Sequence, residues 1–486
     1  MRSIHAHVAA RYNPLRALLL AVGGLVARAG LIARERVERA TDLAWPRIVT
    51  GIARMSRTTA DVAMVGIALG PGAIAGVGYA QPFWGLSFAL GGGIAGGTIG
   101  LVSQRYGADA HEELAVAVKV SALVAIAVTV PVTALYLLVP GPLIDAIGSG
   151  TDAVALGTDY LRIVALGIPF AALNLVGSRT LVGADDAWTP MVLRGGGAMF
   201  NIVVNAALIF GFGMGVVGAA AGTVLSNALV TLALGVGLAR GRLPVVGEFP
   251  VTVPVSGPQF DRSLLADLIE TATPLVGANL ARNGGQFPKL YVVGLFGPNV
   301  VAAYVVAMRV RALMETPNWG FSMASSSLVG QALGADDERE AGEWARDVLR
   351  FSLAVFAVIA AGTFVLARPI GRVFVDDPAI LPTVVVFIRV TCLGVLFSGV
   401  YGGATGPLRA SGDTRWPLYA QLAGLYVFAL PVATVGVLVP AVGVTALYAA
   451  VVVELAIPAL VVYYRYHSGA WKVISRDYRP DATPTD

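Results

Sequence analysis

The stretch “VSQRYGADA”, residues 102–110, returns as “VGQALGADD” at residues 329–337, so that Gln104 and Gln331 are 227 positions apart. The same shift, without a gap, carries “YLRIVALGIPF” (160–170) onto “FIRVTCLGVLF” (387–397) and “GADDAWTP” (183–190) onto “ASGDTRWP” (410–417). Several motifs in one register indicate an internal duplication. The duplication decides the fold, and its marker residues are Pro46, Gln104, Gly107, Gln331 and Gly334.

The composition is that of a membrane protein. The chain has 486 residues, of which 56% are hydrophobic and only 13% charged, with a mean hydropathy of +0.74. A soluble protein of this length needs more charge to cover its surface. Apolar runs of about 20 residues recur and are long enough to cross a ~30 Å hydrocarbon layer. We therefore predict an all-α polytopic membrane protein, surrounded by lipid and without a nucleic-acid partner.

Hydropathy and Gly/Pro punctuation predict twelve spans, six in each half, so both copies enter the membrane from the same side. Two like six-helix bundles facing a midplane cavity are the architecture of alternating access. The predicted spans are 46–67, 74–100, 114–138, 160–182, 190–211, 216–239, 266–295, 300–328, 346–367, 384–406, 416–437 and 441–464. The predicted segments are an N-terminal segment (1–45), an N-lobe (46–239), a linker (240–262), a C-lobe (263–466) and a tail (467–486).

The distribution of cations predicts the orientation. Alternate connections are rich in arginine and lysine, whereas “LGPGA”, “GFGMG” and “LFGPN” contain none. The positive-inside rule then places both termini on the cytoplasmic side, and we expect the membrane to be the cell membrane. For residues 1–45 we predict an amphipathic helix on the cytoplasmic membrane surface. A signal peptide is the alternative, since “ARA” resembles a cleavage site. We expect a monomer.

The first span carries three charges on one helical face. Arg54, Arg57 and Asp61 are spaced i, i+3, i+7. Intramembrane charges face the bundle or a water-filled cavity, and Asp61 lies ~22 Å along the helix from Pro46, beyond the midplane. Burial favours the neutral carboxyl group and a nearby cation favours the charged one, so Asp61 could take up and release a proton. A static Arg57–Asp61 ion pair is the alternative.

Polar residues of the same half are the predicted partners of Asp61. They are Asn174 on the fourth span, Asn201 and Asn205 on one face of the fifth, and Thr223 on the sixth. Amide and hydroxyl oxygens suit hydrogen bonds to a carboxyl group or a weakly held Na⁺. The alternative for the asparagines is a structural one, as hydrogen-bonded contacts between helices.

In the first span of each half the repeat runs at a shift of 228, and Asp61 falls on Lys289. Pro288, just before it, predicts a kink. We expect the second lobe to present a positive wall and Asp61 to be the only exchangeable carboxylate. The candidate residues of this wall and its cavity are Asn279, Arg282, Gln286, Lys289 and Glu454.

Three further features have simpler interpretations. Arg311 and Glu315, at i, i+4, predict a structural pair. Glu454 either lines the second-lobe cavity or pairs with one of its cations. “GGGIAGG”, residues 91–97, lies inside a span with no strand before it, which favours close helix packing over nucleotide binding. No catalytic constellation is visible, so we do not expect an enzyme or an organic cofactor.

Together these motifs resemble the multidrug and toxic compound extrusion (MATE) family over about residues 45–466. The resemblance rests on a first-span proline followed fifteen residues later by aspartate, and on “LVGQALGAD” (328–336), “LRASGDT” (408–414), “NIVVN” (201–205) and “GAAAGT” (218–223). It implies twelve helices in two lobes and export of small organic compounds, mostly cationic or amphipathic. It also implies coupling to inward flow of H⁺ or Na⁺, with Asp61 as the coupling aspartate.

The departures from the family pattern narrow the expectation. The family usually has aspartate where Asn205 stands, which favours H⁺ over Na⁺, although Asp61, Asn201 and Asn205 could still hold Na⁺. Arg282 and Ser398 replace the acidic pair of one branch, so the chain looks closer to the DinF-like or archaeal branch. The alternative function is a flippase of lipid-linked precursors, a related two-lobe architecture that usually has additional spans.

Overall fold

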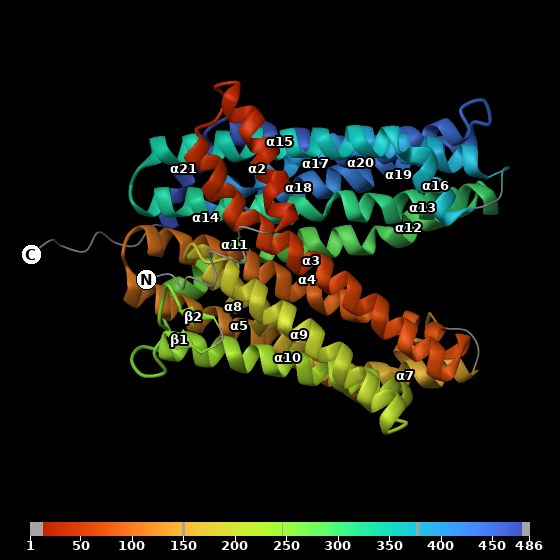
Figure 1. Ribbon diagram of the computed structural model, residues 1–486, viewed down its shortest axis with the longest axis horizontal. Helices are drawn as coiled ribbons and strands as arrows, with labels where there is room; N and C mark the ends of the chain where they lie inside the picture. The colour runs from red at the N-terminus through yellow and green to blue at the C-terminus, as the bar shows by residue number, and fades with distance from the viewer. Residues whose placement is uncertain (1–12, 148–150, 245, 376–377, 379, 479–486) are drawn as a thin grey trace, which may run out of the picture. The chain divides into compact units, whose positions relative to one another are not determined.

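The computed structural model describes residues 13–147, 151–244, 246–375, 378 and 380–478. Within these ranges the chain is almost entirely helical (Figure 1). The sheet found there is a two-stranded antiparallel hairpin, formed by β1 (Arg242–Leu243) and β2 (Gly247–Glu248). The hairpin lies in the stretch 240–262, which the sequence predicts to link the two halves.

The helices follow one another along the chain with short connections. The first half contains α2 (Pro14–Arg28), α3 (Arg34–Leu69), α4 (Pro71–Gly107), α5 (His111–Leu138), α6 (Pro140–Asp145), α7 (Thr151–Ala165), α8 (Ile168–Gly183), α9 (Trp188–Ala206), the π-helical η1 (Ala207–Gly211) and α10 (Gly215–Arg240). The second half contains α11 (Arg262–Gly284), α12 (Gln286–Gly294), α13 (Pro298–Met314), α14 (Thr316–Gly334), α15 (Glu338–Val365), α16 (Ala367–Phe374), α17 (Leu381–Ala410), α18 (Arg415–Leu422), the π-helical η2 (Ala423–Ala429), α19 (Leu430–Leu438), α20 (Val444–His467), α21 (Ala470–Ser475) and the 3₁₀-helical η3 (Arg476–Tyr478).

Helix boundaries recur at the shift found in the sequence. Helices α5 and α15 differ by 227 positions at both ends, and so do the ends of α4 and α14, of α8 and α17, and of α10 and α20. The turns recur as well, because Asp109 (φ 55°) and Asp336 (φ 61°) both adopt the left-handed conformation. Aspartate tolerates this conformation better than most residues, since its side chain is short and polar. The structure confirms the internal repeat.

Eight helices of the described residues are long and apolar enough to cross a membrane, and the bent pair α7–α8 makes a ninth. The other three predicted spans correspond to α3, to α11–α12 and to α13–α14. Charged residues interrupt the apolar surface of α3, and breaks shorten the helices of the other two. The all-α polytopic fold is confirmed.

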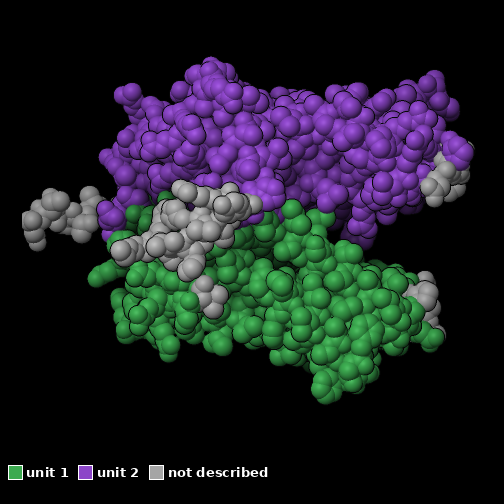
Figure 2. Space-filling model, in the orientation of Figure 1, with its two compact units in different colours: residues 1–2, 49–106, 110–279 green, residues 3–48, 107–109, 280–486 purple. Residues whose placement is uncertain are grey.

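The chain divides into two compact units, coloured separately in Figure 2. Unit 1 holds Val49–Tyr106 and Ala110–Asn279, and unit 2 holds residues 13–48, Gly107–Asp109 and the described residues from Leu280 onward. Helices α3 and α11 therefore each contribute to both units. The lobe boundaries 46–239 and 263–466 follow the repeat in the sequence and stay a prediction.

The glycines of residues 91–97 let two helices of unit 1 approach closely. A Cβ atom on Gly93 would lie 2.3 Å from Val276 Cγ2 and 2.5 Å from the Val276 backbone nitrogen, and one on Gly97 would lie 3.0 Å from Thr271 Oγ1. Helix α4 thus packs directly on the first part of α11. The close-packing interpretation of this stretch is confirmed.

Gly107 of the first copy lies against Gln331 of the second, and both residues belong to unit 2. A Cβ atom on Gly107 would lie 1.9 Å from the Gln331 carbonyl oxygen, so only glycine fits there. Gln331 Nε2 donates to Ser327 Oγ at 2.9 Å. Gln104 is buried, Gly334 ends α14, and Pro46 lies inside α3.

The N-terminal segment forms helices that pack on α15. Asn13 caps α2 by accepting a hydrogen bond from the Leu15 backbone N–H, and Arg350 Nη1 donates to the Leu31 carbonyl oxygen at 2.7 Å. Arg36 binds Glu343 at 2.6 Å. The position of residues 1–45 on the cytoplasmic membrane surface stays a prediction. Residues 1–12, and residues 479–486 of the tail, lie outside the described residues.

Candidate functional site

Asp61 is buried in unit 1 and receives its hydrogen bond from an amide. Asn205 Nδ2 donates to Asp61 Oδ1 at 2.7 Å, and it lies 3.4 Å from Asn201 Oδ1. Asn201 Nδ2 donates in turn to Thr223 Oγ1 at 3.3 Å. Gly222 makes room for this arrangement, because a Cβ atom there would lie 1.8 Å from Asn205 Oδ1. The structure thus brings together four of the five predicted coupling residues.

The Asp61 carboxylate faces a cavity. The cavity has a volume of about 480 Å³, including its solvent-open part. Its polar lining residues are Arg57, Thr58, Asp61, Gln81, Trp84, Tyr160 and Thr223. A buried carboxylate with one amide partner and a path to water is an arrangement in which a proton or a cation can be exchanged.

Arg57 does not form an ion pair with Asp61: in the part of the chain that the structure describes, no cation lies within 4 Å of the Asp61 carboxylate. Arg57 lines the same cavity, and its Nε is buried without a hydrogen-bond partner among the described residues. Arg54 stacks over the ring of Phe88, with 5.1 Å between the guanidinium carbon and the ring centroid. The static-pair alternative therefore has no support in this geometry.

Arg194 is a further charged residue near this site that the sequence did not predict. It lies in α9 and interacts electrostatically with both Arg54 and Arg57. In the sequence it lies near the start of a predicted span, where a cation also fits the positive-inside rule. Its spacing could have revealed it, because Arg194, Asn201 and Asn205 stand at i, i+7, i+11 and so share one face of the helix.

Asn174 belongs to a different hydrogen-bond network. Its Nδ2 donates to Asn227 Oδ1 at 3.1 Å, and its Oδ1 accepts from Thr231 Oγ1 at 2.8 Å. These contacts join α8 to α10, which agrees with a structural role between helices. A part for Asn174 in ion coupling stays a prediction.

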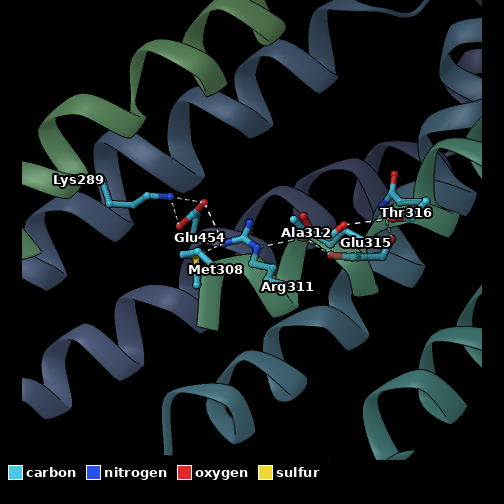
Figure 3. Close-up of polar contacts among 9 residues, drawn as sticks. Lys289, Met308, Arg311, Ala312, Glu315, Thr316 and Glu454 are labelled. Carbon is cyan, nitrogen blue, oxygen red and sulfur yellow. Dashed lines mark hydrogen bonds and ion pairs between the residues drawn. The ribbon is translucent and has the colours of Figure 1, made fainter. Parts of the chain in front are cut away.

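Unit 2 contains a chain of buried charges (Figure 3). Lys289 Nζ donates to Glu454 Oε1 and Oε2 at 3.0 and 3.1 Å, and Arg311 Nη1 donates to Glu454 Oε1 at 3.2 Å. Arg311 Nε binds Glu315 Oε1 at 3.2 Å, and Ser398 Oγ donates to the same oxygen at 3.0 Å. Glu454 therefore pairs with two cations, and the predicted Arg311–Glu315 pair is confirmed.

This geometry differs from the expected positive wall. Lys289 is 7% exposed and paired with Glu454, so it does not present an uncompensated charge. Helix α11 ends at Gly284 and α12 begins at Gln286, although Gly285 between them keeps a helical backbone conformation. Pro288 explains the break, since it has no N–H to donate to the carbonyl group four residues earlier.

The remaining second-half candidates are separated. Asn279 lies in unit 1, where its Nδ2 donates to the Ala89 carbonyl oxygen at 3.3 Å, and Gln286 is exposed. Arg282 stacks over Trp319, 5.4 Å from the ring centroid. It lines a second cavity, of about 530 Å³ with its solvent-open part, together with Arg311, Glu315, Asn318, Trp319, Ser398, Tyr401, Gln421 and Glu454.

Comparisons with known proteins agree with this architecture. The MatE family model matches residues 46–207 and 274–435, once in each half. A probable multidrug resistance protein NorM of Bradyrhizobium diazoefficiens is 27% identical, over 81% of this chain and 85% of that protein. The multidrug resistance protein PmpM of Pseudomonas aeruginosa is 26% identical, over 83% of this chain and 84% of that protein.

A solved structure shows the same fold. A multidrug resistance MATE family transporter of the MOP superfamily, in an outward-facing conformation, has a TM-score of 0.82 and 21% identity, over 90% of this chain and 96% of that one. At this identity the likeness establishes the fold, which has twelve helices in two lobes. Both segments matched by the family begin at a proline of the repeat, Pro46 and Pro274. The chain belongs to the MATE family of membrane transporters.

Proposed function

We propose that the chain exports small organic compounds by alternating access, and that inward flow of H⁺ or Na⁺ through the Asp61 site drives the export. The observation that carries this proposal is the hydrogen bond from Asn205 to a buried Asp61 that has no cation within 4 Å among the described residues. Names of relatives that refer to multidrug resistance support the class of substrate.

The chemistry of the site favours H⁺ as the coupling ion. Burial disfavours the charged carboxylate, and the Asn205 amide partly offsets that cost by donating a hydrogen bond. Opening of the cavity to water on one side or the other would shift the balance and let a proton enter or leave. Asn205 Oδ1 has no partner among the described residues, so an oxygen set of Asp61, Asn201 and Asn205 keeps Na⁺ as the second candidate.

The test uses purified protein in liposomes with a fluorescent substrate and an imposed H⁺ or Na⁺ gradient. We expect Asp61→Asn to lose gradient-driven transport, because the amide has no exchangeable charge. Asp152→Asn is the matched control, since Asp152 is exposed in the same unit. Retained gradient-driven transport by Asp61→Asn would remove Asp61 from the mechanism. Comparison of the two gradients identifies the ion.

The finer assignments are also part of the proposal. We infer a cell-membrane location with cytoplasmic termini from the positive-inside rule, and a monomer surrounded by lipid. Arg282 and Ser398, which replace the acidic pair of one branch, favour the DinF-like or archaeal branch. The expectation that the substrates are cationic comes from the family resemblance alone. The charged residues near Asp61, which are mostly arginines, are relevant to that expectation.

A further inference from the structure

Arg57 lines the Asp61 cavity in unit 1, and Arg54 and Arg194 interact electrostatically with it. Arg54 and Arg57 lie on successive turns of α3, and Arg194 lies on α9. Arg194 is repelled by both of the others, and Arg54 by Arg57. The three arginines are therefore within electrostatic range of one another, although they come from two helices far apart in the sequence.

Within the part of the chain that the structure describes, Asp61 attracts Arg57 only from beyond ion-pair distance. None of the three arginines forms an ion pair there, and the only carboxylate of the cavity, Asp61, is bonded to Asn205. Three positive charges and one negative charge leave a net charge of +2. Uncompensated charges in a membrane protein are costly, and they mark sites where an external charge binds.

Apolar and aromatic surface lies beside the arginines. Phe88 packs under the Arg54 guanidinium, and Trp84 lines the Asp61 cavity. Trp84 and Phe88 also line a neighbouring cavity of about 210 Å³, including its solvent-open part, whose other lining residues include Ile168 and Leu175. An anionic group near the arginines would thus have aromatic and apolar side chains beside it.

We propose that Arg54, Arg57 and Arg194 bind the anionic group of an amphipathic organic anion, whose apolar part lies against Trp84 and Phe88. Guanidinium groups bind carboxylates and related anions through paired, charge-assisted hydrogen bonds. The buried, unpartnered Nε of Arg57 is a donor for such a bond. The inference deepens the proposed function and rests on it, because it names the class of compound that this lobe carries.

Asp61 sets the sign of the electrostatic coupling. A proton on Asp61 raises the net charge of the cluster from +2 to +3, so a bound anion and that proton favour each other. A cation would be disfavoured by the same proton and by all three arginines. A neutral residue at position 61 should therefore strengthen anion binding, whereas the same change should abolish ion-driven transport.

The test measures equilibrium binding by full-length protein in phosphatidylcholine nanodiscs. Two xanthene dyes of opposite charge serve as probes, anionic fluorescein and cationic pyronin Y. We expect the wild-type protein to bind fluorescein more tightly than pyronin Y. Arg57→Gln and Arg194→Gln should each weaken fluorescein binding about tenfold, which corresponds to the loss of one charge-assisted hydrogen bond.

Matched variants separate charge from geometry. Arg240→Gln, an exposed arginine at the end of α10, should leave fluorescein binding unchanged. Arg57→Lys keeps the charge but not the planar fork, so it should bind with intermediate affinity. It also serves as the test where Arg57→Gln fails to fold. Asp61→Asn should bind fluorescein more tightly, which distinguishes this inference from the coupling proposal, since binding at equilibrium needs no gradient.

Two kinds of result would overturn the inference. The first concerns the probes. The wild-type protein could bind pyronin Y more tightly than fluorescein, or the Arg57 and Arg194 variants could bind fluorescein as tightly as the wild type does. The second concerns the source of the anion. If fluorescein binding disappears in nanodiscs that contain phosphatidylglycerol, a lipid headgroup occupies the arginines and the organic-anion assignment is wrong.

Discussion

The two cavities hold their charges in opposite ways, although the repeat places Asp61 and Lys289 at matching positions. In unit 2, Lys289 and Arg311 share Glu454, so each of these buried cations has an acidic partner. In unit 1, the described residues around Asp61 form no ion pair, and an amide takes the place of a cation. A duplicated fold has thus kept its helix boundaries while the charges at its first span reversed.

This difference assigns different roles to the two sites. Paired charges hold helices together, and removal of one partner leaves the other buried and uncompensated. Charges without an internal partner contribute little to helix association, and they remain open to a proton, an ion or a substrate. The comparison therefore predicts large stability effects in unit 2, and functional effects with small stability changes at Asp61.

The largest effect is expected for Glu454→Ala. The change leaves Lys289 without its partner and Arg311 with Glu315 alone. Loss of one member of a buried ion pair costs about 3–5 kcal/mol. The free energy of unfolding of the purified protein in detergent, measured with denaturant, should fall by that amount.

Two controls show whether pairing is the cause. Glu35 is exposed and also lies in unit 2. Glu35→Ala should therefore change the free energy of unfolding by no more than about 0.5 kcal/mol. The double variant Lys289→Met with Glu454→Met should be more stable than Glu454→Ala, because it leaves no unpaired lysine. If Glu454→Ala is as stable as the wild type, the ion pairs of unit 2 do not stabilise the fold, and the two cavities do not differ in this respect.

An intermediate effect is expected for Gly222→Ala. The added Cβ atom would lie 1.8 Å from Asn205 Oδ1, so the amide must move away from Asp61. Overpacking of this kind costs about 1–3 kcal/mol. Gradient-driven transport should weaken with it, since the hydrogen bond to the carboxylate is disturbed.

Gly235→Ala, on the same helix, is the matched control. No atom lies within 4 Å of a Cβ at this position. Alanine should stabilise the helix there by up to about 1 kcal/mol without affecting transport. If Gly222→Ala transports normally at wild-type stability, the position of the Asn205 amide is not important for the mechanism.

The sequence predicted the parts of this structure that follow from local pattern and repetition. The shift of 227 positions predicted equal bundles, and the structure repeats its helix ends at that shift. Asp61, Asn174, Asn201, Asn205 and Thr223 were predicted together because polar residues within apolar spans must face their own bundle. The structure brings four of them together, whereas Asn174 bonds to Asn227 and Thr231 instead.

The sequence could not predict contacts that depend on which helices meet. The Lys289–Glu454 pair joins residues 165 positions apart, and nothing in the local pattern connects them. The spacing of Arg282, Gln286 and Lys289 predicts one helical face, but Lys289 pairs with Glu454, Gln286 is exposed and Arg282 stacks over Trp319. Arg194 lay near the predicted start of a span, where topology explained its charge equally well.

The smallest stability effect, and the sharpest form of the comparison, is expected for Asp61→Asn. The new amide can still accept the hydrogen bond from Asn205 through its oxygen, and no ion pair among the described residues is lost. The free energy of unfolding should therefore change by less than about 1 kcal/mol, a typical value for one hydrogen bond. The measurement is the denaturant series used for Glu454→Ala.

Arg57→Gln extends the same reasoning. Arg57 repels Arg54 and attracts the Asp61 carboxylate, so the two interactions offset each other and its neutralisation should change the stability only slightly. If Arg57 and Asp61 formed a structural ion pair, both single variants would instead lose stability, and the double variant would lose less than the sum of the two. If both single variants lose about 3 kcal/mol or more of unfolding free energy, as expected for Glu454→Ala, the unit 1 charges hold the helices together. The coupling role of Asp61 would then lose its structural basis.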